Sequence, residues 1–311
     1  MRSPLANGPR RPRVRSLPAR LARKAWPGKH VARCVQGVSL VLPWSHRLPD
    51  YAEAFPTYGQ NLVALARLLK PASEPLRMLD VGANVGDSAL QVLTHVDARI
   101  LCVEGDPYWL KFLHRNVGGE ERVSVEASLL VPSDGQGAGL MSPIREAGTT
   151  RFVPSDSHHA LEHLAVTELR TLHPSFSDIR LVKSDTDGYE VSLVPAIADA
   201  WKSSEPVLFF EYDPRLSRTA GFERPEMLWQ DLSSRGYRNV ALWDNTGAPL
   251  GRSTAEELQI LCRDLDTDPA QLGYQYWDVA AAHELDEVAQ DALRRLVPGL
   301  YSGSSRPRGT R

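Results

Sequence analysis

Residues 76–86 read LRMLDVGANVG, and this stretch decides the fold. Its first half, residues 76–81, is an apolar run that fits a strand buried on both faces. Small residues follow it, and after Asp87 apolar residues recur at helical spacing. A strand, a glycine-containing turn and a helix form the ligand-binding corner of an open α/β sheet, because small residues let a cofactor approach the main chain. The stretch therefore predicts a cofactor site at its turn.

The acidic character of this turn favours one cofactor over another. A dinucleotide site needs G-x-G-x-x-G to seat a pyrophosphate on a helix N-terminus, but Asn84 stands where the second glycine belongs. Asp80 would repel a pyrophosphate and suits the ammonium and sulfonium of S-adenosylmethionine (SAM). Glu104 ends the next apolar run, where a carboxylate can accept hydrogen bonds from both ribose hydroxyls. The pattern predicts SAM, and the alternative is that both acids are ordinary strand-end residues.

A second acidic turn lies at residues 181–190, LVKSDTDGYE. Asp185 ends an apolar strand there, and in a doubly wound sheet the carboxyl end of this strand lies beside that of the 76–81 strand. We therefore expect Asp185 in the same crevice, where an acid can hold the methionyl ammonium of SAM or orient an acceptor hydroxyl. The predicted cofactor-binding residues are Asp80, Gly82, Ala83, Asn84, Gly86, Glu104 and Asp185.

Strand and helix patterns alternate over residues 76–214, which predicts a doubly wound α/β sheet. The glycine-rich segment 133–154 predicts loops or a small hairpin inserted between sheet and helix, and residues 160–172 predict a helix. Beyond Pro214 the pattern changes, and a tight turn at residues 244–247 leads into a further short strand. These later elements predict antiparallel additions at the sheet edge rather than a second domain.

The composition fits one globular α/β domain with extensions, since 42% of the 311 residues are hydrophobic and 24% charged. We expect a flexible basic leader over 1–30, a single domain over 31–300 and a disordered tail over 301–311. Residues 1–49 hold eleven Lys or Arg and no acid, so the remainder carries a charge of −13 although the whole chain carries −2. The leader lacks interleaved aromatic residues that stack on bases, so we expect a solvated segment and no nucleic-acid partner.

Cysteine usage and hydropathy indicate the compartment. Cys34, Cys102 and Cys262 are scattered and form no C-x-x-C pair, which favours reduced thiols in a reducing compartment. No apolar run approaches the roughly 20 residues of a membrane span. Arg10 and Arg11 resemble a twin-arginine signal, but no apolar segment follows them. We expect a cytoplasmic protein without a membrane span, and the sequence leaves its oligomeric state open.

The chain resembles the FkbM-type SAM-dependent methyltransferases in four segments, which are DVGANVGD (80–87), VEGDP (103–107), VKSDTDGYE (182–190) and LFFEYDP (208–214). The FkbM-like core spans residues 58–214, and it departs from the family pattern at Asp187, where Glu is more frequent, and at Gly105, where Pro is more frequent. The resemblance implies a class I methyltransferase fold, with a seven-stranded, mostly parallel sheet that has one antiparallel strand. It also implies methylation of an oxygen on a small hydroxylated molecule, often a sugar or a natural-product scaffold.

Methyl transfer needs an aligned acceptor oxygen and a base that takes its proton. His158 and His159 stand between a loop and a helix and titrate near neutrality, although exposed polar loop residues are the alternative. Lys183 and the acids of the second turn are rivals for this role. The predicted catalytic residues are Asp185, Asp187, Glu190, His158 and His159.

Two further alternatives concern a metal and the acceptor. Catechol-type methyltransferases bind magnesium through acids at the ends of the fourth and fifth strands and a neighbouring Asn. Asp185 and Glu211 could correspond, but Tyr212 stands where the Asn would be, so we expect no metal. No Asn-Pro-Pro-aromatic stretch follows the fourth strand, which weakens nucleic-acid methylation. A SAM-binding scaffold without turnover and a methyltransferase of a macromolecule stay open.

Overall fold

The computed structural model describes residues 29–133, 141–146, 148–154, 161, 163–264 and 276–301. The expected leader and tail therefore lie outside the described residues, apart from residues 29, 30 and 301. Within the described ranges, no helix combines the length and the apolar character needed to cross a bilayer.

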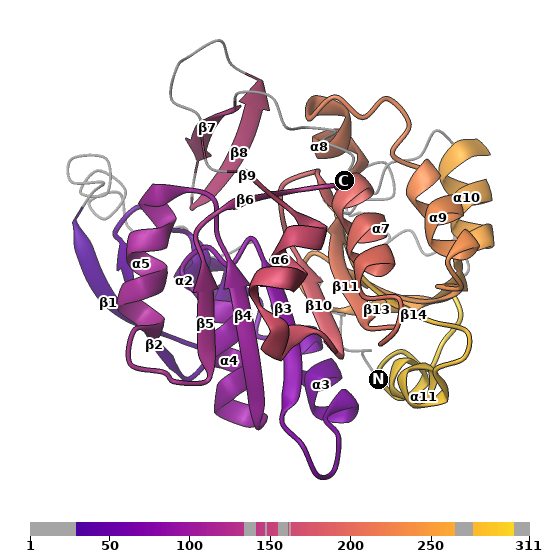
Figure 1. Ribbon diagram of the computed structural model, residues 1–311, viewed down its shortest axis with the longest axis horizontal. Coiled ribbons are helices and arrows are strands. Elements are labelled where there is room, and N and C mark those ends of the chain that lie inside the picture. Colours follow the sequence, from indigo (N-terminus) through magenta and orange to yellow (C-terminus); the bar gives the residue numbers. More distant parts are fainter. Residues whose placement is uncertain are drawn as a thin grey trace, which may run out of the picture.

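The described chain is organised around one eight-stranded sheet (Figure 1). Its strands, in spatial order from one edge, are β13 (Pro249–Thr254), β12 (Asn239–Asp244), β14 (Trp277–Ala282), β11 (Val207–Tyr212), β10 (Leu181–Ser184), β3 (Leu76–Val81), β4 (Ala98–Val103) and β5 (Val123–Glu126). The five strands from β11 to β5 are parallel to one another. Strand β14 runs antiparallel to both of its neighbours, and β13 runs antiparallel to β12.

Seven of these strands form the predicted seven-stranded, mostly parallel sheet, with β14 as its antiparallel strand. The eighth, β13, is an antiparallel addition at the edge, as the pattern beyond Pro214 predicts. The turn between β12 and β13 is held by Asp244, whose Oδ1 accepts hydrogen bonds from the backbone N–H of Thr246 at 2.9 Å and of Ala248 at 3.0 Å. The predicted α/β fold class is confirmed.

Alternating side chains bury both faces of the sheet. In β3, Leu79 and Val81 point to one face, whereas Leu76 and Met78 point to the other, and none of the four is more than 2% exposed. A strand buried on both faces must be apolar on both, which explains why this stretch reads as a near-continuous hydrophobic run.

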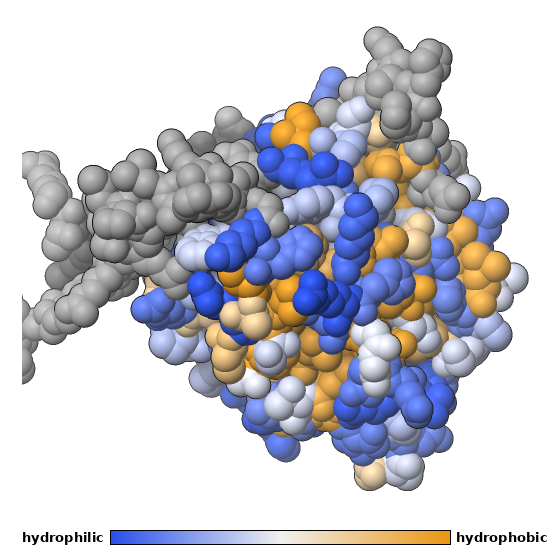
Figure 2. Space-filling view, turned by 90° about the vertical axis from the view of Figure 1, so that its left-hand side faces the viewer, coloured by the Kyte–Doolittle hydropathy of each residue, from blue (hydrophilic) through white to orange (hydrophobic). Residues whose placement is uncertain are grey.

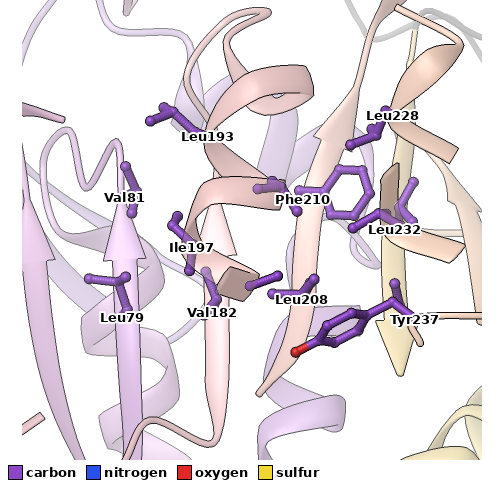
Figure 3. Close-up of a cluster of buried hydrophobic side chains, with 14 of the residues drawn as sticks. Leu79, Val81, Val182, Leu193, Ile197, Leu208, Phe210, Leu228, Leu232 and Tyr237 are labelled. Atoms are coloured by element: carbon purple, nitrogen blue, oxygen red, sulfur yellow. The ribbon is translucent and has the colours of Figure 1, made fainter. Parts of the chain in front are cut away.

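Helices cover the two faces (Figure 1). One face is covered by α6 (Val166–Leu172), α7 (Glu190–Ala200), α9 (Met227–Ser234) and α10 (Ala255–Asp264). Figure 3 shows Ile197 of α7 next to Val182 of β10 within this apolar layer. The opposite face is covered by α3 (Gln60–Leu69), α4 (Asp87–His95), α5 (Pro107–Val117) and α11 (Glu287–Leu296).

Three short two-stranded sheets complete the described fold, pairing β1 (His30–Val35) with β2 (Val38–Pro43), β6 (Leu129–Val131) with β9 (His163–Ala165), and β7 (Met141–Glu146) with β8 (Thr149–Pro154). The β7–β8 hairpin confirms the small hairpin predicted within 133–154, and it stands above the main sheet in Figure 1. The helix predicted over 160–172 is wrong in its first part. Residues 163–165 pair with β6 instead, and the helix begins only at Val166.

The β1–β2 side of the molecule has a mixed surface. Figure 2 views this side and shows hydrophilic and hydrophobic residues interspersed over it. Beneath the strands, Leu40 and Leu42 of β2 are fully buried against Trp109 and Phe112 of α5. This small apolar cluster fixes the N-terminal hairpin to the main domain, at the end of the sheet where the turns described next are found.

Candidate functional site

The turn between β3 and α4 is tight because two glycines adopt left-handed backbone conformations. Gly82 has a φ of +72°, and a Cβ built there would lie 1.9 Å from the backbone oxygen of Asp185. Gly86 has a φ of +82°, and a Cβ there would lie 2.9 Å from the side chain of Leu113. Ala83 is buried, and its N–H donates to the backbone oxygen of Val103 at 3.1 Å. The small residues therefore let this turn pack against the β10 turn and α5.

Glu104 ties the first turn to the end of β4. Its Oε2 accepts a hydrogen bond from the backbone N–H of Asn84, and its Oε1 accepts one from the N–H of Asp106, each at 2.7 Å. The side chain is buried, and this burial raises its pKa to about 7, against the lowering effect of the two N–H donors. Next to it, Gly105 has no room for a side chain, since a Cβ would lie 2.9 Å from Leu129 Cα.

A first cavity opens beside Glu104, between the ends of β3 and β4 and the β7–β8 hairpin. Its empty space is about 830 Å³, a volume that includes the solvent at its open mouth. Its polar lining includes Asn84, Glu104, Ser128, Thr149, Asp185 and Asp187.

A second cavity lies on the other side of Asn84 and Asp185. It holds about 1010 Å³ of empty space by the same count. The two cavities share four lining residues, Gly82, Asn84, Thr149 and Asp185. The lining of the second cavity also includes His46, Tyr58, Asp87, Lys183, Glu211, Tyr276 and Asp278. The two cavities thus meet at the predicted turns.

Asp80 is placed below the first turn rather than in either cavity lining. It is fully buried, and Lys183 Nζ lies 3.1 Å from its Oδ1. The same Nζ donates to the backbone oxygen of Gly82 at 3.0 Å and lies 3.7 Å from Asp185 Oδ2. Burial raises the pKa of Asp80, while Lys183 acts in the opposite direction. Asp80 therefore reaches the site through Lys183, which it anchors beneath both turns.

The three acids of the second turn differ in what their carboxylates do. Glu190 accepts hydrogen bonds from the N–H and hydroxyl of Thr186 and from the N–H of Gly188, so it holds the turn together. Asp187 lines the first cavity with a φ of +53°, and burial raises its pKa to about 8, with Asp185 adding to the shift. Asp185 lines both cavities and its side chain is 48% exposed. Asp185 is the most accessible acid of the three.

His158 and His159 lie outside the described residues. The histidine that lines the second cavity is His46, before α2 (Leu48–Ala54), and no motif in the sequence indicated it. Its Nδ1 accepts a hydrogen bond from the backbone N–H of Leu48 at 3.1 Å, so the proton of the neutral ring lies on Nε2, 3.5 Å from Asn84 Oδ1. Burial lowers its pKa to about 4. His46 is therefore neutral near pH 7 and offers the cavity a donor rather than a base.

The β7–β8 hairpin is fastened over both cavities by Asp106. Arg145 donates two hydrogen bonds to this carboxylate, each at 2.6 Å, and the hydroxyl of Thr150 donates a third at 2.7 Å. Burial acts to raise the pKa of Asp106, but these donors outweigh it and lower the pKa. At the hairpin turn, Asn84 Nδ2 donates to the backbone oxygen of Gly148 at 2.8 Å. The cover is thus joined to both α5 and the first turn.

Comparison with known proteins finds a low similarity to several solved structures of methyltransferases. No family model and no curated protein matches it. The solved structures that it resembles include human methyltransferase 10 domain containing protein, with 14% identity, 88% of this chain and 96% of that chain covered, and a TM-score of 0.44. They also include an O-methyltransferase from Bacillus cereus in complex with SAH (9% identity, 72% and 79% covered, TM-score 0.40). A third is a putative RNA methyltransferase from Pyrococcus horikoshii (14% identity, 78% and 86% covered, TM-score 0.38).

These similarities are too weak to assign an activity, so an activity has to be argued from the geometry of the site. No group of three His, Cys, Asp or Glu residues among the described residues is arranged to hold a metal ion. Tyr212 stands at the position where a magnesium ligand would be sought. It is buried in the apolar layer that α6, α7, α9 and α10 cover. The site offers two adjoining cavities, each lined by several carboxylates, with Asp185 where the two meet.

Proposed function

We propose that this chain is a SAM-dependent methyltransferase of the FkbM type that methylates a hydroxyl oxygen of a small molecule. The observation that carries the proposal is the meeting of the two cavities at Asn84 and Asp185. A transferase needs its donor and its acceptor in adjoining spaces, with a proton acceptor at the junction.

The first cavity fits the nucleoside part of SAM. Each oxygen of Glu104 accepts one backbone N–H, and a carboxylate oxygen can accept a second hydrogen bond, so both oxygens can also receive a ribose hydroxyl. Asp87 lines the second cavity near the junction and can hold the methionyl ammonium. When bound, SAM supplies a methyl group on a positively charged sulfur.

We assign the general base to Asp185. Asp185 would take the proton of the acceptor hydroxyl while the oxygen bonds to the methyl group that bound SAM would supply, with S-adenosylhomocysteine as the product. Lys183 cannot serve as this base. Burial acts to lower its pKa, but Asp80, Asp185 and Asp87 outweigh burial and raise the pKa, so the ammonium keeps its proton. Its role is to position Asp185 from 3.7 Å.

A small molecule is the acceptor that the site supports best. Gly148 and Thr149 of the hairpin line the second cavity, which limits its size. Lys183 is the one Lys or Arg among the described residues that line either cavity, whereas a nucleic-acid site needs several such side chains for phosphates.

Cys34, Cys102 and Cys262 are free thiols, which supports a cytoplasmic location.

The proposal is tested by isothermal titration with SAM together with a methyl-release assay on a panel of hydroxylated small molecules. We expect SAM to bind and at least one acceptor to be methylated. Binding without turnover on any acceptor would favour a scaffold instead, and absence of SAM binding would overturn the proposal.

A variant then tests the base. For Asp185→Asn we expect a loss of turnover of about 100-fold or more, with SAM affinity changed by less than about threefold, because the amide cannot take the proton. Asp97→Asn, at an exposed position in the turn before β4, is the matched control. Turnover near the wild-type level in Asp185→Asn would remove Asp185 from the reaction.

A further inference from the structure

The far wall of the second cavity carries two carboxylates that face each other across neighbouring strands. Glu211 of β11 and Asp278 of β14 are direct partners in the antiparallel register. These strands lie one and two places beyond β10, so the pair is separated from the junction at Asp185. Like charges directly opposite each other destabilise a sheet, and such an arrangement persists where another group offsets it.

No cation of the described chain forms an ion pair with either acid, although the charge of Lys183 acts to lower the pKa of Asp278. Lys183 is the one Lys or Arg in the described lining of the cavity, and its Nζ is already engaged by Asp80, Gly82 and Asp185. Asp278 Oδ2 accepts a hydrogen bond at 2.7 Å from Asn61, which is a neutral amide. Glu211 has neither a hydrogen bond nor an ion pair with any described residue. Neither carboxylate therefore has an ionic partner within the described chain that would stabilise its ionised form.

The pKa values of both acids agree with this. Burial raises the pKa of Glu211 well above its usual range, and Asp185 adds to the shift. Burial raises the pKa of Asp278 to about 7, although the hydrogen bond from Asn61 acts to lower it. Such groups gain most from a ligand that brings a positive charge, because that ligand restores the ionised forms that burial disfavours.

Two tyrosines line the same cavity next to these carboxylates. Tyr58 precedes α3, and Tyr276 precedes β14. Burial raises the pKa of each phenol, and Glu211 and Asp278 are among the charges that raise it further, so both phenols stay neutral. Neutral aromatic rings beside carboxylates form a favourable surface for an organic cation and do not discriminate in favour of an uncharged polyol.

We propose that Glu211 and Asp278 select an acceptor that carries a protonated amine in addition to the hydroxyl to be methylated. This inference rests on the proposed function, since it names the class of molecule that enters the second cavity. A bound ammonium would lie between the two strands and neutralise the pair, leaving the hydroxyl to reach toward Asp185. A metal ion is a poorer candidate because the described residues hold no three-ligand group.

The test compares matched amine and hydroxyl compounds on the full chain loaded with S-adenosylhomocysteine. The three pairs of probes are ethanolamine with ethylene glycol, 3-amino-1-propanol with 1,3-propanediol, and glucosamine with glucose. The dissociation constant of each probe is measured by ligand-observed NMR at pH 7. We expect at least one amine to bind about tenfold or more tightly than its neutral counterpart. A panel in which no amine exceeds its counterpart would overturn the inference.

Two isosteric variants make the result specific to this wall. Glu211→Gln and Asp278→Asn should each reduce the amine preference to about threefold or less, whereas Glu121→Gln, at an exposed acid before β5, should leave it unchanged. The melting temperature of each free variant should stay the same or rise, since one of two opposed charges is removed. An amine preference that survives both variants would overturn the assignment.

Failure of this inference is distinguishable from failure of the proposed function. If SAM binds and methyl release occurs while amines and neutral compounds bind equally, only the selection by Glu211 and Asp278 is wrong. If SAM does not bind, the proposed function itself fails.

Discussion

The first cavity and the second cavity adjoin each other at Asn84 and Asp185, yet their carboxylates are held in different ways. Beside the first, Glu104 receives one backbone N–H donor on each oxygen, and Glu190 accepts hydrogen bonds from the donors of its own turn. In the second, Glu211 and Asp278 face each other on neighbouring strands, and neither forms an ion pair with a cation among the described residues. A carboxylate held by N–H donors builds structure, whereas a half-buried carboxylate without an ionic partner carries an unfavourable energy that a ligand can relieve. On the proposals above, the first cavity recognises its ligand mainly by shape, and the second recognises its ligand mainly by charge.

The substitution Gly82→Val should break both cavities at once and have the largest effect. A Cβ at this position would lie 1.9 Å from the backbone oxygen of Asp185, and the φ of +72° disfavours any side chain. We expect a loss of about 3 kcal/mol or more of unfolding free energy, with no measurable SAM binding. Chemical denaturation and titration calorimetry measure the two effects. Gly119→Val is the control, because nothing lies within 4 Å of a Cβ there, and equal losses in the two variants would refute the close-approach argument.

The substitution Glu104→Gln should damage the first cavity while sparing the charge of the second. The amide keeps one acceptor oxygen and turns a donor toward one of the two backbone N–H groups of Asn84 and Asp106. We expect a stability loss of about 1–3 kcal/mol and SAM affinity reduced about tenfold or more. Denaturant titration and calorimetry are the measurements. If SAM binds as tightly as in the wild type, Glu104 has no part in the cofactor site.

The dependence of stability on pH should report the raised pKa of Asp278 when wild type and variant are compared, because Glu104 of the first cavity has a pKa raised to about 7 as well. Asp278 has a pKa raised from an ordinary value of 3.8 to about 7, so between these values it is protonated in the folded state and ionised in the unfolded state. The unfolded state then binds fewer protons, and stability falls as pH rises through this window, by at most about 1.4 kcal/mol per pH unit for this one group.

Melting temperatures of the free protein measured from pH 4 to pH 8 check this sign. Asp278→Asn should flatten the fall, because the titrating group has been removed, while Asp97→Asn should leave it unchanged. A wild-type protein that becomes more stable over the same window would contradict the assigned shift.

The smallest effect is expected from the cover that both cavities share. Arg145→Ala removes two hydrogen bonds to Asp106, but the arginine side chain is 41% exposed and the hairpin keeps its contacts from Thr150 and Asn84. We expect SAM to dissociate about threefold faster, with little change in melting temperature. Stopped-flow measurement of dissociation tests this, with Arg99→Ala, at an exposed position in β4, as control. An unchanged dissociation rate would show that the hairpin does not retain the cofactor.

The local sequence pattern was informative where a strand is buried along its length, because such burial restricts which residues the strand can have. The apolar run at 76–81 and the glycines at 82 and 86 indicated strand, turn and sheet corner, and the fold has them there. The helix predicted over 160–172 was wrong at its start because pairing of residues 163–165 with β6 depends on a segment more than thirty residues earlier. A three-residue parallel pairing leaves too little periodic signal to be read locally.

The site shows the same division between local and distant information. Asp278 stands in an otherwise apolar strand, WDVAAA, and an acid in such a strand was a signal available in the sequence. His46 offered no such signal, since its place in the second cavity follows from how the N-terminal segment packs against the first turn. Asp80 was expected to meet the cofactor directly, but its burial beneath the turn and its pairing with Lys183 depend on the register of β3 with β10.

By itself, then, the sequence determined the class of sheet, the two acidic turns and the residue types at the ends of β3, β4 and β10, because strand burial and tight turns restrict residue choice locally. Only the tertiary structure decided which carboxylates are saturated by N–H donors and which oppose each other. That distinction arises from strand order and register, which bring Glu211 and Asp278 together from positions far apart in the chain.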